Sequence, residues 1–397
     1  MASIINATTT NGVVTSGDNS GALVLATNNN TTAVTIGTNQ TATFAQTLNA
    51  PNTFGFKNRI INGAMVVNQR GGTVTSSSSG TYGVDRFTNF ANGGGVFTAV
   101  QSSTVPTGQG FVNSNLLTVT TADSSIASSD FYSYAQAIEG YNIADLQWGT
   151  ASAKTVTLSF WVNSSVTGLF AVALINSDGS RCYPATYTIT TANTWQQITC
   201  TVAGDTGGTW GTTTGQGIVV RYDLGSGSVN NGTANTWNTA GSYAGCRTSS
   251  TVNWIATNGA TFYITGVQLE VGSTATSFDY RPYTTELQLC QRYFWRSTQN
   301  GTNAGLGFAI GTGAATFSRA QIALPVQMRA VPTAVFSSVS VFNSATGVVN
   351  ITLVDSYSTI NLISVDGTAS GTTSPSGGSL LVYLDGASAF ASASAEL

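Results

Sequence analysis

The sequence predicts an all-β protein of several domains, and three observations lead to this prediction. Charged residues make up 7% of the 397 positions, whereas roughly 25% is usual in soluble globular domains. Thr, Ser, Asn and Gly are abundant, and these residues are typical of strands and tight turns. Short apolar stretches recur along the chain, and a hydrophobic content of 41% is enough to form a core.

Residues 1–54 form a segment with a composition of its own. Asp18 is its single charged side chain, and short apolar pieces alternate with Asn-, Gly- and Thr-rich turns. Such strands carry too few large apolar side chains to bury a core within one chain. We therefore expect an elongated shaft or attachment segment of β-strands that forms a trimer by intertwining with sister copies. The alternative is a flexible Thr- and Asn-rich arm.

Residues 55–284 are expected to form a jelly-roll β-sandwich. The alternation within 154–165 predicts a strand that is buried on one face. Asn176 to Gly179 reads Asn-Ser-Asp-Gly, which predicts a hairpin turn within 168–189. Seven or more strands separated by polar loops are typical of a two-sheet sandwich. Further strands are predicted over 194–204, 217–227 and 260–272, and a long loop over 228–250.

The region 55–87 holds the densest group of cations in the chain. These are Lys57, Arg59, Arg70 and Arg86. Asp85 stands directly beside Arg86, and this adjacency predicts a paired, partly buried arginine rather than a free basic patch.

A short helix over 286–294 is expected to connect the sandwich to a C-terminal β domain. Pro282 ends the preceding strand pattern, because proline cannot donate a hydrogen bond to a sheet. Residues 285–288 read Thr-x-x-Gln, which matches a capping box at a helix start. The apolar residues then recur at helical spacing, at Leu287, Cys290 and Phe294.

Residues 285–397 comprise this linking helix and a second predicted β-sandwich. Polar turns separate its strand-like runs, and a Thr-, Ser- and Gly-rich loop is predicted over 367–378. The runs lie at 305–311, 315–324, 333–343, 349–356, 361–367 and 379–387.

Several function classes are disfavoured by what the sequence lacks. Histidine is absent, which removes Ser-His-Asp and Cys-His catalysis and the commonest transition-metal ligand. A net charge of −3 with scattered cations argues against a nucleic-acid partner. No apolar run reaches the roughly 18 residues of a membrane-spanning helix, and the first residues lack a signal-peptide pattern.

Enzymatic activity, a cofactor and a metal are likewise not predicted. The sparse carboxylates form no close pair of the kind that glycoside hydrolysis requires. Residues 16–21 and 176–180 come nearest to calcium-binding loops, but Asx turns explain both. The cysteines show no zinc spacing, and buried thiols are favoured over a disulfide. They are Cys182, Cys200, Cys246 and Cys290.

Aromatic residues in the loops of the sandwich are candidates for glycan binding, because aromatic rings stack on sugar faces. Arg221, Asp223 and Arg247 stand near them in the sequence. The alternative for each ring is packing in the core or between subunits. The candidates are Trp210, Tyr222, Trp237, Tyr243 and Trp254.

Three stretches resemble a known group of proteins. KNRIINGAMVVNQRGG (57–72), followed by YGVDRF (82–87), is similar to the opening motif of many bacteriophage tail-fibre and virion structural proteins. GVQLEVGSTATSFDYRPYTTELQLCQRYFW (266–295) resembles the junction in that group between a carbohydrate-binding-module-like sandwich and a C-terminal module. ALPVQMRAVPTAVF (323–336) resembles the start of that module.

The resemblance implies a virion structural protein that is assembled in the host bacterial cytoplasm and displayed on the particle. The implied partners are two sister copies, other virion proteins in the tail or capsid, to which residues 1–54 attach, and a host-surface glycan, without nucleic acid or membrane insertion. A trimeric tail fibre that binds a host receptor is the first expectation. A head fibre or capsid-decorating protein with no essential ligand is the alternative.

Overall fold

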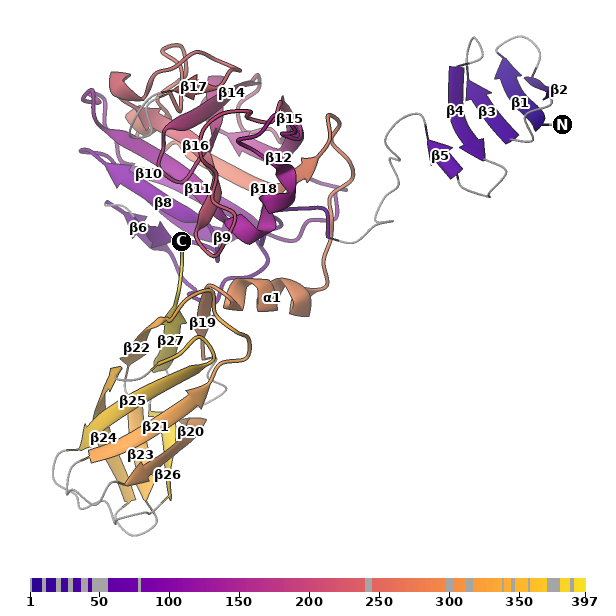
Figure 1. Ribbon diagram of the computed structural model, residues 1–397. Coiled ribbons are helices and arrows are strands. Elements are labelled where there is room, and N and C mark those ends of the chain that lie inside the picture. Colours follow the sequence, from indigo (N-terminus) through magenta and orange to yellow (C-terminus); the bar gives the residue numbers. More distant parts are fainter. Residues whose placement is uncertain are drawn as a thin grey trace. The chain divides into compact units, whose positions relative to one another are not determined.

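A computed structural model shows a protein built almost entirely from β-strands (Figure 1). The chain divides into two compact units, Met1–Thr53 and Phe54–Leu397. The described residues contain one α-helix, so the all-β prediction is confirmed. The structure describes residues 2–8, 12–18, 23–27, 31–36, 42–44, 56–77, 80–239, 245–297, 303–311, 317–337, 339–343, 347–355, 358–369, 379–385 and 389–397.

The first unit is one five-stranded sheet. Its strands are β1 (Ala2–Thr8), β2 (Gly12–Asp18), β3 (Leu23–Thr27), β4 (Thr31–Ile36) and β5 (Ala42–Phe44). Their order is β2-β1-β3-β4-β5, and β1 pairs antiparallel with β2 but parallel with β3. The strands thus pair within one chain, where we expected a segment ordered by sister copies. The trimer itself stays a prediction.

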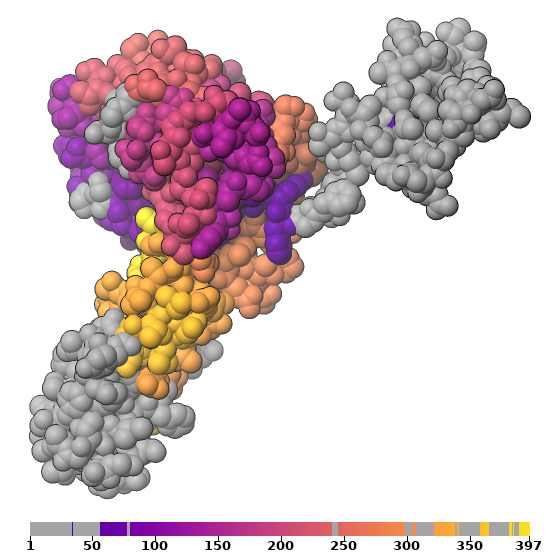
Figure 2. Space-filling model, in the orientation of Figure 1, coloured from indigo at the N-terminus to yellow at the C-terminus, as the bar shows by residue number. Residues whose placement is uncertain are grey.

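The sandwich consists of a six-stranded and a seven-stranded sheet (Figure 1). Its strands are β6 (Val74–Ser76), β7 (Thr81–Tyr82), β8 (Thr88–Asn92), β9 (Val96–Ser102), β10 (Ser114–Thr121), β11 (Phe131–Glu139), β12 (Val156–Ser164), β13 (Gly168–Ile175), β14 (Arg181–Ile189), β15 (Gln196–Val202), β16 (Gln216–Ser226), β17 (Asn238–Thr239) and β18 (Thr261–Val271). The first sheet has the order β15-β12-β18-β10-β9-β6, and the second has the order β17-β14-β13-β16-β11-β8-β7. Figure 2 shows that described residues form most of the visible surface of the sandwich.

The core of the sandwich is aromatic and lies between the two sheets. The Phe160 ring on β12 packs edge-on against Tyr187 and Tyr222 of the opposite sheet, with centroids 5.2 and 5.0 Å apart.

The predicted hairpin is confirmed, because Ile175 pairs with Cys182 across the 176–180 turn. These pairings set which side chains of the seven-stranded sheet face the core and which face outward.

Strand β12 differs from the prediction because it is buried on both faces. Thr157 is fully buried although the alternation placed it on the solvent side. The chain that follows β18 covers this face, and the Thr157 hydroxyl donates to the Gly272 carbonyl at 2.8 Å. A polar side chain is tolerated there because its hydrogen bond is satisfied.

Helix α1 (Tyr283–Gln291) begins three residues before the predicted start, and the capping-box prediction is wrong. Pro282 is the N-cap residue and no side chain caps the helix. Cys290 and Leu287 pack against the 61–67 segment, as the helical spacing predicts. Phe294 lies beyond the helix, in strand β19 (Phe294–Arg296).

The remaining strands form a closed barrel and a small sheet, where the sequence predicts a second sandwich. The barrel strands are β20 (Asn303–Gly311), β21 (Phe317–Ala323), β23 (Val339–Asn343), β24 (Gly347–Asp355), β25 (Leu362–Ala369) and β26 (Ser379–Asp385). They close in the order β20-β21-β25-β24-β23-β26. Strand β27 (Phe390–Ser394) pairs with β19 and with β22 (Thr333–Ser337). The predicted loop 367–378 lies largely outside the described residues.

Candidate functional site

Three of the five aromatic residues predicted to bind glycan are buried. Tyr222 and Trp254 are 0% exposed and Trp210 is 7% exposed, which corrects the expectation that their faces are open to a sugar. Trp237 is half-buried and packs against the core, and Tyr243 lies outside the described residues. Tyr222, Trp254 and Trp210 therefore pack in the core, which is the alternative given for each candidate ring.

A tryptophan cluster formed by Trp148, Trp210 and Trp237 lies beside a cavity of about 340 Å³. The ring centroids are 4.7 to 5.5 Å apart in edge-to-face contacts. Each indole N–H donates to a backbone carbonyl within this part of the sandwich. Because rings and donors are all engaged, the cluster serves packing first. Trp148 and Trp210 line the cavity together with the exposed Gln147.

A second cavity, the sheet-face cavity, lies on the outer face of the seven-stranded sheet and has a volume of about 200 Å³. The Arg221 guanidinium lies over the Phe131 ring, 4.8 Å from its centroid. The buried Nε2 atom of Gln216 makes no hydrogen bond within the described residues. A ring, a cation and an amide donor around a largely apolar floor are the groups that fix a sugar. The lining residues are Thr88, Phe90, Phe131, Ala135, Ala137, Gln216, Val219, Arg221 and Leu397.

Sequence reasoning missed Phe131 and Gln216, although a signal was present. Small residues at Ala135 and Ala137 repeat with period two from Phe131, and this leaves space on one face of β11. Which face of the strand points outward depends on its pairing with β16, and that pairing is not encoded in the local pattern.

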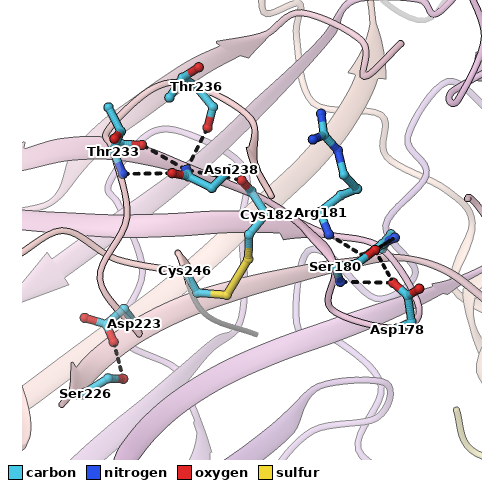
Figure 3. The surroundings of a disulfide bond; sticks show 11 residues. Asp178, Ser180, Arg181, Cys182, Asp223, Ser226, Thr233, Thr236, Asn238 and Cys246 are labelled. Atoms are coloured by element: carbon cyan, nitrogen blue, oxygen red, sulfur yellow. Dashed lines mark hydrogen bonds between the residues drawn. A yellow bond between two sulfur atoms is a disulfide. The ribbon is translucent and has the colours of Figure 1, made fainter. Parts of the chain in front are cut away.

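A disulfide joins Cys182 on β14 to Cys246 across a gap of 5.8 Å between their Cα atoms (Figure 3). The expectation of four thiols is therefore corrected for this pair, while Cys200 and Cys290 are buried free thiols. Both disulfide-bonded residues belong to an apolar cluster on the outer face of the seven-stranded sheet, with Ala135, Ala173, Ile175 and Val219. The disulfide thus fastens the segment around Cys246 over the part of the sheet that adjoins the sheet-face cavity.

Arg247, which stands near the candidate rings in the sequence, is buried and structural. Its guanidinium donates to the Thr251 hydroxyl at 2.9 Å and to the Asn253 side chain at 2.6 Å. It lies 3.6 Å from a carboxylate oxygen of Asp223, which also accepts a hydrogen bond from the Ser226 hydroxyl at 2.6 Å. This network fixes the return of the 228–250 loop to the sheet.

The buried Asp223 makes the stability of the sandwich depend on pH. Burial raises the pKa of this carboxyl above its ordinary 3.8, although Arg247 acts in the opposite direction. A raised pKa in the folded state means that the folded protein binds the proton more tightly than the unfolded chain, so stability rises as the pH falls. We expect the free energy of unfolding of the wild type, relative to Asp223→Asn, to increase as the pH is lowered from 7 towards 4.

Urea unfolding of both proteins at a series of pH values measures this difference. The carboxamide that replaces the carboxyl in the variant does not titrate, so contributions from all other groups cancel in the comparison. A difference that stays constant, or that falls on acidification, contradicts the prediction.

Two of the three stretches that carry the family resemblance, 57–72 and 266–295, pack against each other at a domain junction. The Asp279 carboxylate accepts hydrogen bonds from the backbone N–H groups of Lys57 and Asn58, at 3.0 and 3.2 Å. Arg281 donates to the Ile60 carbonyl at 3.1 Å and pairs with Glu286 at 3.2 Å. The 57–72 and 266–295 stretches are therefore halves of one polar seam.

A second group of buried charges ties this seam to the last residues of the chain. Arg86, 2% exposed, forms an ion pair with Glu396 and lies over the Tyr293 ring at 3.5 Å. Arg70 lies 3.2 Å from Glu396 and 3.5 Å from Asp85. The prediction that Arg86 is paired and buried is confirmed, but its partner is the distant Glu396, while the adjacent Asp85 pairs with Arg70. Burial raises the pKa of Asp85.

The described residues contain no group of three His, Cys, Asp or Glu side chains that could hold a metal ion. No helix in the described part of the chain is long and apolar enough to cross a membrane.

Neither a protein-family model nor a curated protein matches the chain. Among solved structures, the enzymatically active domain of tailspike protein 4 from bacteriophage CBA120 is 13% identical, with a TM-score of 0.29; the match covers 54% of this chain and 22% of that one. A family 11 carbohydrate-binding module from Clostridium thermocellum is 12% identical with a TM-score of 0.26, covering 50% and 94%. A family 61 module bound to β-1,4-galactotriose is 12% identical with a TM-score of 0.26, covering 55% and 100%.

The chain thus spans about a fifth of the tailspike structure that it matches (22%). TM-scores of this size do not establish a common fold. The function of this protein has to be inferred from its own residues.

Proposed function

We propose that the protein is a structural protein of a bacteriophage virion, a tail fibre that binds a glycan on the host cell surface. The observation that carries the proposal is the polar seam at the domain junction, where Asp279 and Arg281 form hydrogen bonds with the backbone of residues 57–60. The two stretches that resemble virion proteins are joined by a hydrogen bond between residues 222 positions apart in the chain, and together they form one structural unit. Because the two stretches form this junction together, their combined resemblance supports a domain architecture shared with virion proteins better than either stretch alone.

The glycan is proposed to bind in the sheet-face cavity. Phe131 offers a ring for stacking on a sugar face, Gln216 offers an amide N–H donor for a hydroxyl oxygen, and Arg221 contributes a positive charge beside them. The cavity is backed by rigid strands, so its groups are held in position before a ligand arrives.

The first unit is proposed to trimerise the fibre and to attach it to the particle. A single sheet forms one layer, and stable domains need at least two packed layers around a core. Association with sister copies supplies the missing layer. Native mass measurement of the whole protein should give a trimer, and removal of residues 1–53 should give a monomer.

Binding of purified protein to an array of bacterial surface glycans tests the receptor role. Phe131→Ala should weaken the strongest interaction at least tenfold, which corresponds to about 1.4 kcal/mol. Phe56→Ala is the matched control, because Phe56 is 64% exposed and does not line the cavity. The proposal fails if the wild type binds no glycan and does not inhibit phage adsorption, or if both variants lose binding equally.

A further inference from the structure

A third cavity, the junction cavity, lies where helix α1 and strand β19 meet the barrel strands β20 and β21. Its volume is about 430 Å³, larger than that of the sheet-face cavity. Two aromatic rings line it, Tyr283 at the start of the helix and Trp295 on β19. Tyr283 is 57% exposed, so its ring is available to a ligand that enters from solvent.

The polar groups of the junction cavity are donors that the protein itself leaves largely unused. The side-chain amides of Asn68 and Gln291 donate no hydrogen bond within the part of the chain that the structure describes, and neither does the indole N–H of Trp295. Gln69, in contrast, is fully engaged: it donates to the Phe294 carbonyl at 2.7 Å and its Oε1 accepts from the Arg296 backbone at 3.4 Å. The rim of the cavity is therefore fixed while several donors remain for solvent or ligand.

The charge of the cavity comes from Arg296. Its guanidinium lies over the Phe390 ring, 4.2 Å from the centroid, and one terminal nitrogen donates to the Arg70 carbonyl at 2.5 Å. Held on two sides, the guanidinium keeps further N–H groups of its planar fork for a ligand. None of the described residues that line the cavity carries a carboxylate. An anionic group is therefore favoured there over a neutral or cationic one.

We propose that the junction cavity is a second saccharide-binding site and that it takes an acidic sugar of the uronate type. The carboxylate of the sugar accepts hydrogen bonds from Arg296, and the apolar face of the sugar stacks on the exposed ring of Tyr283. The amides of Asn68 and Gln291 donate to hydroxyl groups. Asp85, the acidic residue that contacts Gln69 of the rim, does not line the cavity and is held by Gln69 and Arg70.

Titration calorimetry of the full chain tests this site with two probes of equal length, hexagalacturonate and maltohexaose. The wild type is expected to bind hexagalacturonate, and Arg296→Gln should weaken that binding at least tenfold. Arg296→Lys keeps the charge but loses the planar fork of N–H donors. Its affinity for hexagalacturonate should therefore lie between those of the wild type and Arg296→Gln. Maltohexaose should bind at least tenfold more weakly than hexagalacturonate to the wild type.

Two tyrosines supply a matched pair for the aromatic contact. Tyr283→Ala should weaken hexagalacturonate binding about tenfold, whereas Tyr141→Ala, at a side chain 60% exposed outside the cavity, should leave it within about twofold. Because Tyr283 is exposed, its replacement is compatible with folding even where Arg296→Gln is not, and circular dichroism checks both. Binding that is equal for the two probes, or unchanged by Tyr283→Ala, overturns the inference.

The same titrations separate this site from the sheet-face cavity. Phe131→Ala should leave hexagalacturonate binding at the junction unchanged. Loss of binding in Phe131→Ala but not in Tyr283→Ala would assign the sugar to the sheet-face cavity and overturn the second site, while leaving the proposed receptor role intact.

Discussion

Replacing Glu396 by Ala is expected to lower the free energy of unfolding of the second unit by about 3–5 kcal/mol, the usual effect of removing one member of a buried ion pair. The large effect follows from the positions of its partners. Arg86 is 2% exposed and Arg70 has a side chain 17% exposed, so neither can regain full hydration after the carboxylate is lost. Tyr293 still contacts Arg86 through its ring, but a ring face offsets a small part of a buried charge.

Urea unfolding followed by tryptophan fluorescence measures this loss, and the chain supplies its own control. Arg59 and Asp145 form an ion pair at 2.7 Å with side chains 22% and 49% exposed. Asp145→Ala should therefore cost less than about 1 kcal/mol, because water and salt screen exposed pairs. Equal losses in the two variants would mean that the buried network contributes no more than a surface contact.

Breaking the disulfide between Cys182 and Cys246 is expected to lower stability by about 4 kcal/mol, the size predicted for a closed loop of this length. The two cysteines are 64 positions apart, so the bond removes much conformational freedom from the unfolded chain. In the folded state the sulfurs also fill part of the apolar cluster with Ile175 and Val219. The unfolding midpoint in urea should therefore fall when a reducing agent is added.

The double variant Cys182→Ser, Cys246→Ser separates this effect from any action of the reductant elsewhere. Its midpoint should be low with and without dithiothreitol, because Cys200 and Cys290 are free thiols in the folded protein. A wild-type midpoint that does not respond to dithiothreitol under conditions that expose all four thiols would contradict the prediction.

Local patterns predicted much of the fold. Period-two stretches and the 176–179 turn gave β12, the β13–β14 hairpin, β15, β16 and β18, because alternation and turn residues act over a few positions. Strand β27 was missed, since its FASAS run carries mainly small residues and offers little hydrophobic contrast. Closure of the barrel was also missed, because it depends on pairing β20 with β26, about 75 residues later.

The candidate site was harder to predict than the fold. A ring such as Tyr222 lies in an alternating strand, and alternation does not say which of the two faces is the core. The partners of Arg86, Arg281 and Cys182 are 310, 221 and 64 positions away, so no local pattern contains them. Side chains become a site only when these distant pairings are fixed.

The separation between Arg86 and Glu396 also has a consequence for synthesis. At elongation rates of about 5–20 residues per second, 310 residues take roughly 15–60 s to translate, so Arg86 is synthesised long before its partner exists. The sandwich strands can pair during that interval, but a buried cation without its carboxylate keeps the junction weak. The junction therefore reaches its full stability only after translation has passed residue 396 and the ion pair can form.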